Sequence, residues 1–110
     1  MKRCVVGIRS TDQQEANRTG KESPTVWFAS MASLAAVLSE DNRALLKVIR
    51  DAQPRSLTEL AELTGRKVSN LSRTLRTMAS YGIVKLERDK GEVQPTALVT
   101  EFMIILDCDR

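Results

Sequence analysis

The stretch from Leu60 to Met78 reads LAELTGRKVSNLSRTLRTM, and its interpretation decides the fold. Two short segments with apolar residues at helical spacing meet at Gly65, where a left-handed turn or a close approach of helices is expected. The second segment predicts a helix over residues 67–81, which Gly82 terminates. The stretch is therefore either a helix–turn–helix unit that contacts a partner with its second helix, or a helical hairpin with a solvated polar face.

The predicted helix 67–81 has an apolar and a polar face. At spacings of three and four residues, the apolar stripe is expected to lie on the preceding helix and to consist of Val68, Leu71, Leu75 and Met78. The opposite face carries residues suited to nucleic acid, namely Ser69, Asn70, Arg73, Arg76 and Thr77. Arginine can bond guanine bidentately, asparagine can do the same with adenine, and hydroxyl groups can bond phosphates or bases.

Base-reading residues lie near the N-terminus of the second helix in helix-turn-helix proteins. The candidates for contacts to base edges are therefore Ser69, Asn70 and Arg73. The candidates for contacts to the flanking phosphates are Arg66, Lys67 and Arg76. Taken singly, these residues also have simpler interpretations, since Ser69 or Asn70 can begin a helix and Arg76 can be a solvated surface residue.

The segments on either side of this stretch extend the pattern. Before it, Leu57 is predicted to form a brief strand, and Thr58 is predicted to cap a helix over residues 59–64 whose Leu60, Ala61 and Leu63 face inward. After it, residues 83–87 alternate like a half-buried strand, residues 88–91 have hairpin-turn chemistry, and residues 92–94 return. This hairpin resembles a wing, from which Arg88 and Lys90 can reach a DNA backbone or minor groove. A polar hairpin tip is the equal alternative.

The positive charge is concentrated in the same part of the chain. Seven basic and two acidic residues lie between Arg66 and Lys90, a net charge of +5, whereas the whole chain carries +3. Such a concentration is typical of a surface that binds a polyanion, although a solvated basic face has the same composition.

The flanks predict further helices and strands. Ser30 and Ser39 are expected to cap two helices, the second with Ala52 in its buried stripe and a stop at Gln53-Pro54. Strands are expected at residues 4–8, 25–29 and 100–106, although a helix over 97–106 is not excluded. Residues 10–23 form a polar excursion. The expected division is residues 1–29 (strands and excursion), 30–96 (winged core) and 97–110 (C-terminal strand), all in one structural domain.

Composition excludes several classes of function. The chain has 110 residues, no histidine, and cysteines only at Cys4 and Cys108. Because histidine and cysteine are the usual metal ligands and catalytic side chains, we expect no metal site, no cofactor and no catalytic residues. The protein is therefore not predicted to be an enzyme. No apolar run approaches the ~20 residues of a membrane span, and no signal-like segment follows the first residues. We therefore expect a cytoplasmic protein without a membrane partner.

Residues 56–93 (SLTELAELTGRKVSNLSRTLRTMASYGIVKLERDKGEV) resemble the core of MarR-like and ArsR-like winged helix-turn-helix transcriptional regulators. The flanking TVWFAS and EFMIILD segments resemble small prokaryotic predicted regulators of the antitoxin-like type. The resemblance implies a DNA-binding repressor or autoregulator with an α+β, mainly helical fold: a winged helix-turn-helix core with extra N- and C-terminal strands. Metal sensing is not implied, because the ArsR-type ligands have no counterpart here.

Proteins with this motif usually bind double-stranded DNA as dimers, so a homodimer is expected, with the apolar strands forming a small sheet that completes the monomer or builds the dimer interface. Two alternatives remain open at this point. One is a winged-helix module that binds another protein instead of DNA, and the other is an antitoxin whose terminal segments bind a toxin-like partner.

Overall fold

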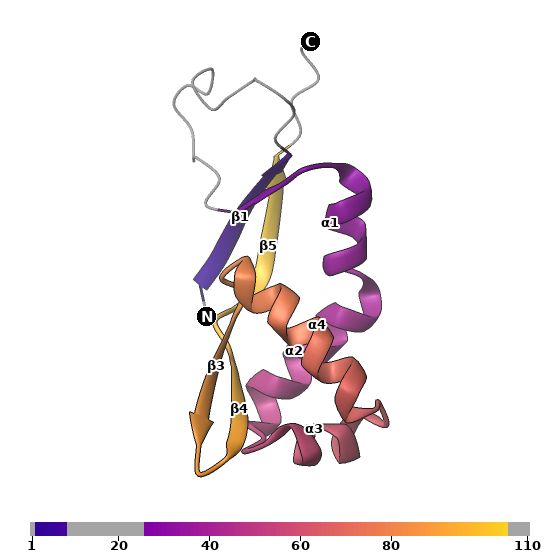
Figure 1. Ribbon diagram of the computed structural model, residues 1–110. Helices are drawn as coiled ribbons and strands as arrows, with labels where there is room; N and C mark the ends of the chain where they lie inside the picture. The colour runs from indigo at the N-terminus through magenta and orange to yellow at the C-terminus, as the bar shows by residue number, and fades with distance from the viewer. Residues whose placement is uncertain (1, 9–25, 106–110) are drawn as a thin grey trace.

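A computed structural model describes residues 2–8 and 26–105, which form four helices and two sheets (Figure 1). The elements in chain order are β1 (Lys2–Ile8), β2 (Val26–Phe28), α1 (Met31–Val37), α2 (Glu40–Ala52), α3 (Leu57–Thr64), α4 (Val68–Ser80), β3 (Val84–Asp89), β4 (Glu92–Ala97) and β5 (Val99–Ile105). The predicted α+β class is confirmed, and so is a strand at the C-terminal segment. The polar excursion 10–23 and Cys108 lie outside the described residues.

The helices α1 and α2 begin at serines, as predicted. The hydroxyl of Ser30 accepts a hydrogen bond from the backbone N–H of Ser33, and the hydroxyl of Ser39 accepts one from Asn42. Each such cap satisfies an N–H group that has no partner inside the helix, and typically contributes about 1 kcal/mol. At the far end of α2, Gln53 adopts a left-handed conformation and stops the helix.

The start of α3 differs from the prediction. Leu57, predicted as a strand residue, is the first residue of α3, and Ser56 rather than Thr58 caps the helix by accepting from the N–H of Glu59. Both hydroxyl residues have capping chemistry, and the helix begins two residues earlier because Leu57 packs against the core. The helix ends at Gly65, whose φ of 79° is the predicted left-handed turn.

The strands β1, β2 and β5 form a parallel sheet with β1 in the centre. Val6 of β1 pairs with Val26 on one side and with Ile104 on the other. The three strands belong to one chain, so this sheet completes the fold of the single chain. It lies at the opposite end of the molecule from α3 and the tip of the β3–β4 hairpin (Figure 1).

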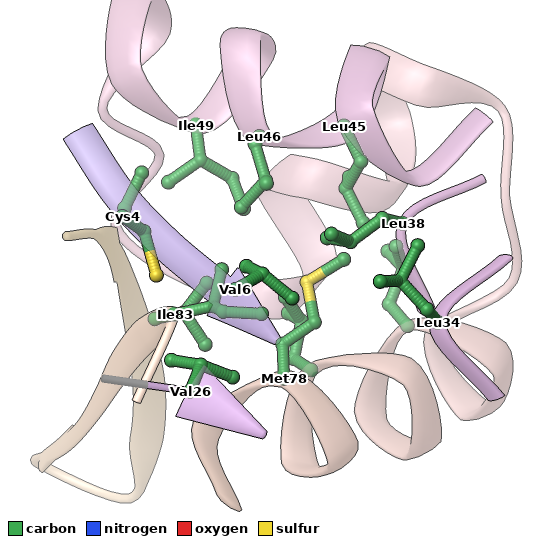
Figure 2. Packing of buried hydrophobic residues seen from close by; sticks show 14 of the residues in the cluster. Cys4, Val6, Val26, Leu34, Leu38, Leu45, Leu46, Ile49, Met78 and Ile83 are labelled. Carbon is green, nitrogen blue, oxygen red and sulfur yellow. The ribbon is translucent and has the colours of Figure 1, made fainter. Parts of the chain in front are cut away.

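One cluster of buried apolar side chains joins the helices to the parallel sheet. Figure 2 shows side chains of α2 lying over Val6 of β1 and Ile83, with Met78 of α4 approaching from the other side. Burial of each such side chain stabilises the fold by ~1.5–3 kcal/mol. Phe28 extends the cluster: it is buried and stacks on the ring of Tyr81 with centroids 4.3 Å apart, whereas Trp27 is half-buried.

Three residues predicted to face the core are exposed instead. Val68 and Leu63 keep 42% and 51% of their surface accessible, and Ala52 is also exposed. Each lies at or near the end of its helix, beyond the part that the neighbouring elements cover. The helical spacing of apolar residues therefore extends beyond the part of each helix that the core covers. The predicted burial of these three residues is wrong for this reason.

Candidate nucleic-acid interface

The helix α4 separates its apolar and polar residues as predicted, apart from Val68. Leu71, Leu75 and Met78 are fully buried and hold the helix against α3 and the core. The side chains predicted to face a ligand are all exposed, namely Ser69, Asn70, Arg73, Arg76 and Thr77. The helix contains no acidic residue, so nothing on its exposed face offsets the two arginines.

The first turn of α4 is exposed to the solvent. Lys67 is its N-cap residue and makes no side-chain capping hydrogen bond, unlike the serines before α1, α2 and α3. Residues 67–70 are all exposed, and burial begins at Leu71. The N-terminus of the helix therefore presents both its side chains and the positive end of its dipole to the solvent.

Arg66 is held by the protein on two sides. Its Nε donates to Oδ1 of Asn70 at 3.1 Å, and its Nη2 donates to Oδ1 of Asn42 at 3.2 Å. Asn42, in the first turn of α2, in turn donates from Nδ2 to the carbonyl oxygen of Val37 at 3.1 Å. The arginine thus joins the start of α4 to the start of α2. Asn42 is a residue of this site that the sequence did not indicate, because it lies on a different helix.

The two arginines of the exposed face are held differently. Arg76 donates from Nη2 to the hydroxyl of Ser72 at 3.2 Å, one turn earlier on the same helix. In the part of the chain that the structure describes, the guanidinium of Arg73 donates to no protein acceptor. Its five donors are therefore available to an external acceptor.

The predicted wing is the antiparallel hairpin of β3 and β4. Its turn consists of Lys90 and Gly91, whose φ values of 55° and 81° are those of the two-residue turn that suits a twisted hairpin. Arg88 and Lys90 are exposed, as predicted. The turn and the α3–α4 corner lie toward the same end of the molecule (Figure 1). Both therefore lie at the end of the molecule opposite the parallel sheet.

Negative charge moderates the base of this hairpin. Lys85 forms an ion pair with Glu87, with Nζ and Oε2 3.1 Å apart and both side chains more than half exposed. Such an exposed pair contributes little to stability but reduces the local positive field. At the tip, the exposed carboxylates of Asp89 and Glu92 likewise reduce the positive charge of Arg88 and Lys90.

A groove of about 370 Å³ lies between the C-terminal part of α2 and strand β4, lined in part by Ile49, Gln53 and Pro95. Its rim carries Arg50, which donates to Asp51 at 2.8 Å; this hydrogen bond holds the pKa of the Asp51 carboxyl below its ordinary value. No polar side chain is buried within the described residues, so the groove has no buried group that could orient a ligand.

The described residues contain neither a cluster of metal-binding side chains nor a membrane-spanning helix. Residues 2–8 and 26–105 contain no group of three or more histidine, cysteine, aspartate or glutamate residues that could hold a metal ion. The same part of the chain has no helix that is long and apolar enough to cross a membrane.

Comparisons with known proteins agree with this architecture. The model of one protein family, HVO_A0114, matches residues 37–104, which is more than half of the chain. The chain is also similar to the crystal structure of a predicted DNA-binding transcriptional regulator from E. coli. The TM-score is 0.51 at 23% sequence identity, and the match covers 63% of this chain and 74% of that chain. At this identity the similarity shows a shared fold. No match was found among curated proteins.

Proposed function

The chain belongs to the HVO_A0114 family, and we propose that it is a transcriptional regulator that binds double-stranded DNA and places α4 in the major groove. The observation that carries this proposal is the exposed face of α4, which combines arginine, asparagine and hydroxyl side chains and contains no acidic residue. A major groove ~12 Å wide accepts one α-helix, and these side chains have the donors and acceptors that base edges and phosphates require.

The geometry supports different roles for the residues of this face, some contacting bases and others contacting phosphates. Arg73, whose guanidinium has no protein acceptor among the described residues, is assigned to a guanine edge, and Ser69 and Asn70 are assigned to neighbouring bases. Lys67 and Arg76 flank these residues and are assigned to phosphates. Arg66 keeps three of its five donors after bonding Asn42 and Asn70, so it can add a phosphate contact while it positions the helix.

The hairpin supports the same orientation on DNA. With α4 in a major groove, Arg88 and Lys90 at the hairpin tip are assigned to the adjacent backbone or minor groove. The similar fold of a predicted DNA-binding regulator from E. coli also supports this function. The protein would then act in the compartment that holds the DNA, the cytoplasm of a prokaryotic cell.

We infer that two copies bind together. A single winged unit makes few contacts, and helix-turn-helix proteins reach specific affinity by placing two reading helices ~34 Å apart on one face of the duplex. The parallel sheet supplies a surface for this assembly, since β5 is an edge strand and carries Ile104 with 44% of its surface exposed. Sedimentation of the protein as a monomer at high micromolar concentration would contradict this inference.

Equilibrium binding to DNA tests the proposed function. The probes are the DNA upstream of the protein's own gene and a shuffled duplex of equal length, each at two salt concentrations. A specific regulator binds its own site about 10³-fold or more tightly than the shuffled duplex. Equal, weak and strongly salt-dependent binding to both duplexes, unaffected by Arg73→Ala, would leave only non-specific attraction of charge.

The same experiment distinguishes DNA binding from the alternative in which the protein binds another protein. The exposed edge of β5 is the feature that favours it, because an edge strand can pair with a strand of another chain. A module that acts only through proteins would bind neither duplex. An antitoxin-like regulator would bind its own DNA and would also co-purify with the product of a neighbouring gene.

A further inference from the structure

Val68 is an exposed apolar residue in a place where folding does not require one. It continues the stripe of Leu71, Leu75 and Met78, yet those three are fully buried and Val68 keeps 42% of its surface accessible. A β-branched residue is also a weaker helix former than alanine. Neither packing nor helix propensity therefore accounts for a valine as the first residue of α4.

The surroundings of Val68 restrict what it can contact. It lies between Lys67 and Ser69 in the first turn of α4, and residues 67–70 of this turn are all exposed. In a helix-turn-helix protein this turn enters the major groove first. An apolar side chain at this position then meets base edges rather than phosphates, because phosphates need a charged or hydrogen-bonding partner.

The major groove offers one apolar group, the 5-methyl of thymine. We propose that Val68 is a specificity-determining residue that selects thymine by packing its two methyl groups against this 5-methyl. This inference rests on the proposed DNA-binding function and adds one element to it: the recognised sequence contains a thymine that is read without a hydrogen bond.

The geometry of α4 also places this thymine relative to the base that Arg73 reads. Five residues separate Val68 from Arg73, which corresponds to about 7.5 Å along the helix axis. This is roughly two base steps at ~3.4 Å each. The thymine should therefore lie about two base pairs from the guanine assigned to Arg73.

A binding-site selection followed by single-atom changes in the DNA tests this inference. Duplexes that bind the full chain are first enriched from a randomised library. Each thymine of the enriched sequence is then replaced in turn by uracil, which lacks only the 5-methyl group. At one thymine, uracil should lower the affinity of the unaltered protein about fourfold, as expected for one methyl group removed from an apolar contact.

The variants make the assignment specific to Val68. Val68→Ala should bind the thymine duplex about fourfold or more weakly, and at that position uracil should cause little further loss, because the methyl group no longer has its partner. Leu63→Ala is the matched control: Leu63 is equally apolar and 51% exposed, but lies on α3, which does not enter the groove. It should retain the full response to uracil.

The outcomes separate this inference from the proposed function. An enriched sequence in which every thymine tolerates uracil, or in which uracil affects Val68→Ala as much as the unaltered protein, overturns the role of Val68 and leaves the regulator intact. A library without any enriched sequence overturns specific DNA binding, and the role of Val68 with it. Thermal unfolding of Val68→Ala should match that of the unaltered protein, so a loss of affinity cannot come from misfolding.

Discussion

Arg66 fixes the orientation of Asn70: its Nε donates to Oδ1 of Asn70 at 3.1 Å while its Nη2 donates to Oδ1 of Asn42 at 3.2 Å. A guanidinium only donates, so the amide oxygen of Asn70 must face Arg66 and the amide nitrogen must face the solvent. Arg66 therefore ties the first turn of α4 to α2 and determines which end of the Asn70 amide reaches a ligand. This is a positioning role in addition to the phosphate contact predicted from its charge.

Removal of this arginine should weaken the fold as well as DNA binding. Arg66→Ala is expected to lower the free energy of unfolding by ~1 kcal/mol, because an exposed hydrogen bond to Asn70 and a part-buried one to Asn42 of α2 are lost. The neighbouring Lys67→Ala should leave stability unchanged, since Lys67 is exposed and makes no capping hydrogen bond. Urea denaturation measures both, and equal stabilities of the two variants would show that the Arg66 bonds contribute nothing.

Arg73 and Arg76 should differ in their effect on specificity. Arg73→Ala is expected to cost ~1–3 kcal/mol of binding to the specific sequence and to relax the preference at one base pair. Arg76→Ala, which removes a side chain assigned to phosphate, should weaken binding to all sequences alike and reduce the salt slope by about one. Titrations of specific and shuffled duplexes over a range of salt concentrations distinguish the two effects. Uniform losses for both variants would remove base reading from Arg73.

The buried and exposed ends of one apolar stripe should respond very differently to truncation. Leu71→Ala is expected to lower the free energy of unfolding by ~2–5 kcal/mol, because Leu71 is fully buried and a cavity remains. Val68→Ala, one turn away, should change it by less than ~0.5 kcal/mol. Thermal or chemical unfolding of the two variants measures the contrast. A large loss in Val68→Ala would mean that Val68 packs in the core after all.

The hairpin turn allows its shape and its charge to be tested separately. Gly91 has a φ of 81° with open space around its missing Cβ, so Gly91→Ala should cost ~1–2 kcal/mol through backbone strain alone. Lys90→Asn should keep the turn, because asparagine tolerates the left-handed conformation of Lys90, but should remove one charge. DNA affinity should then fall for all sequences, with a salt slope smaller by about 0.9. An unchanged slope would place the hairpin tip away from DNA.

Local patterns predicted much of this structure. The polar face of α4, the turn at Gly65 and the hairpin at Lys90-Gly91 follow from helical periodicity and turn chemistry, which neighbouring residues determine by themselves. The exposure of Val68 could not be predicted in this way. The spacing of apolar residues shows which face of a helix is buried, but not how far along the helix the neighbouring elements pack against it.

Contacts between residues far apart in the chain could not be predicted from the sequence either. Asn42 lies 24 residues before Arg66, and no local signal links an asparagine in one helix to an arginine before another. Likewise, the apolar segments predicted three strands outside the winged core, but not that β1 would be the central one. Strand order depends on pairings between residues far apart in the chain, which propensity does not encode.

The central position of β1 has a consequence for how the chain becomes folded during its synthesis. Val6 is fully buried and pairs with Ile104, a residue that the ribosome adds long after β1 has been made. The helices and the hairpin depend on nearer neighbours and can form earlier, whereas β1 must remain without its longest partner strand until β5 exists. Closing so long a loop has a large entropic cost, so we expect the sheet to assemble after the helices and the hairpin have formed.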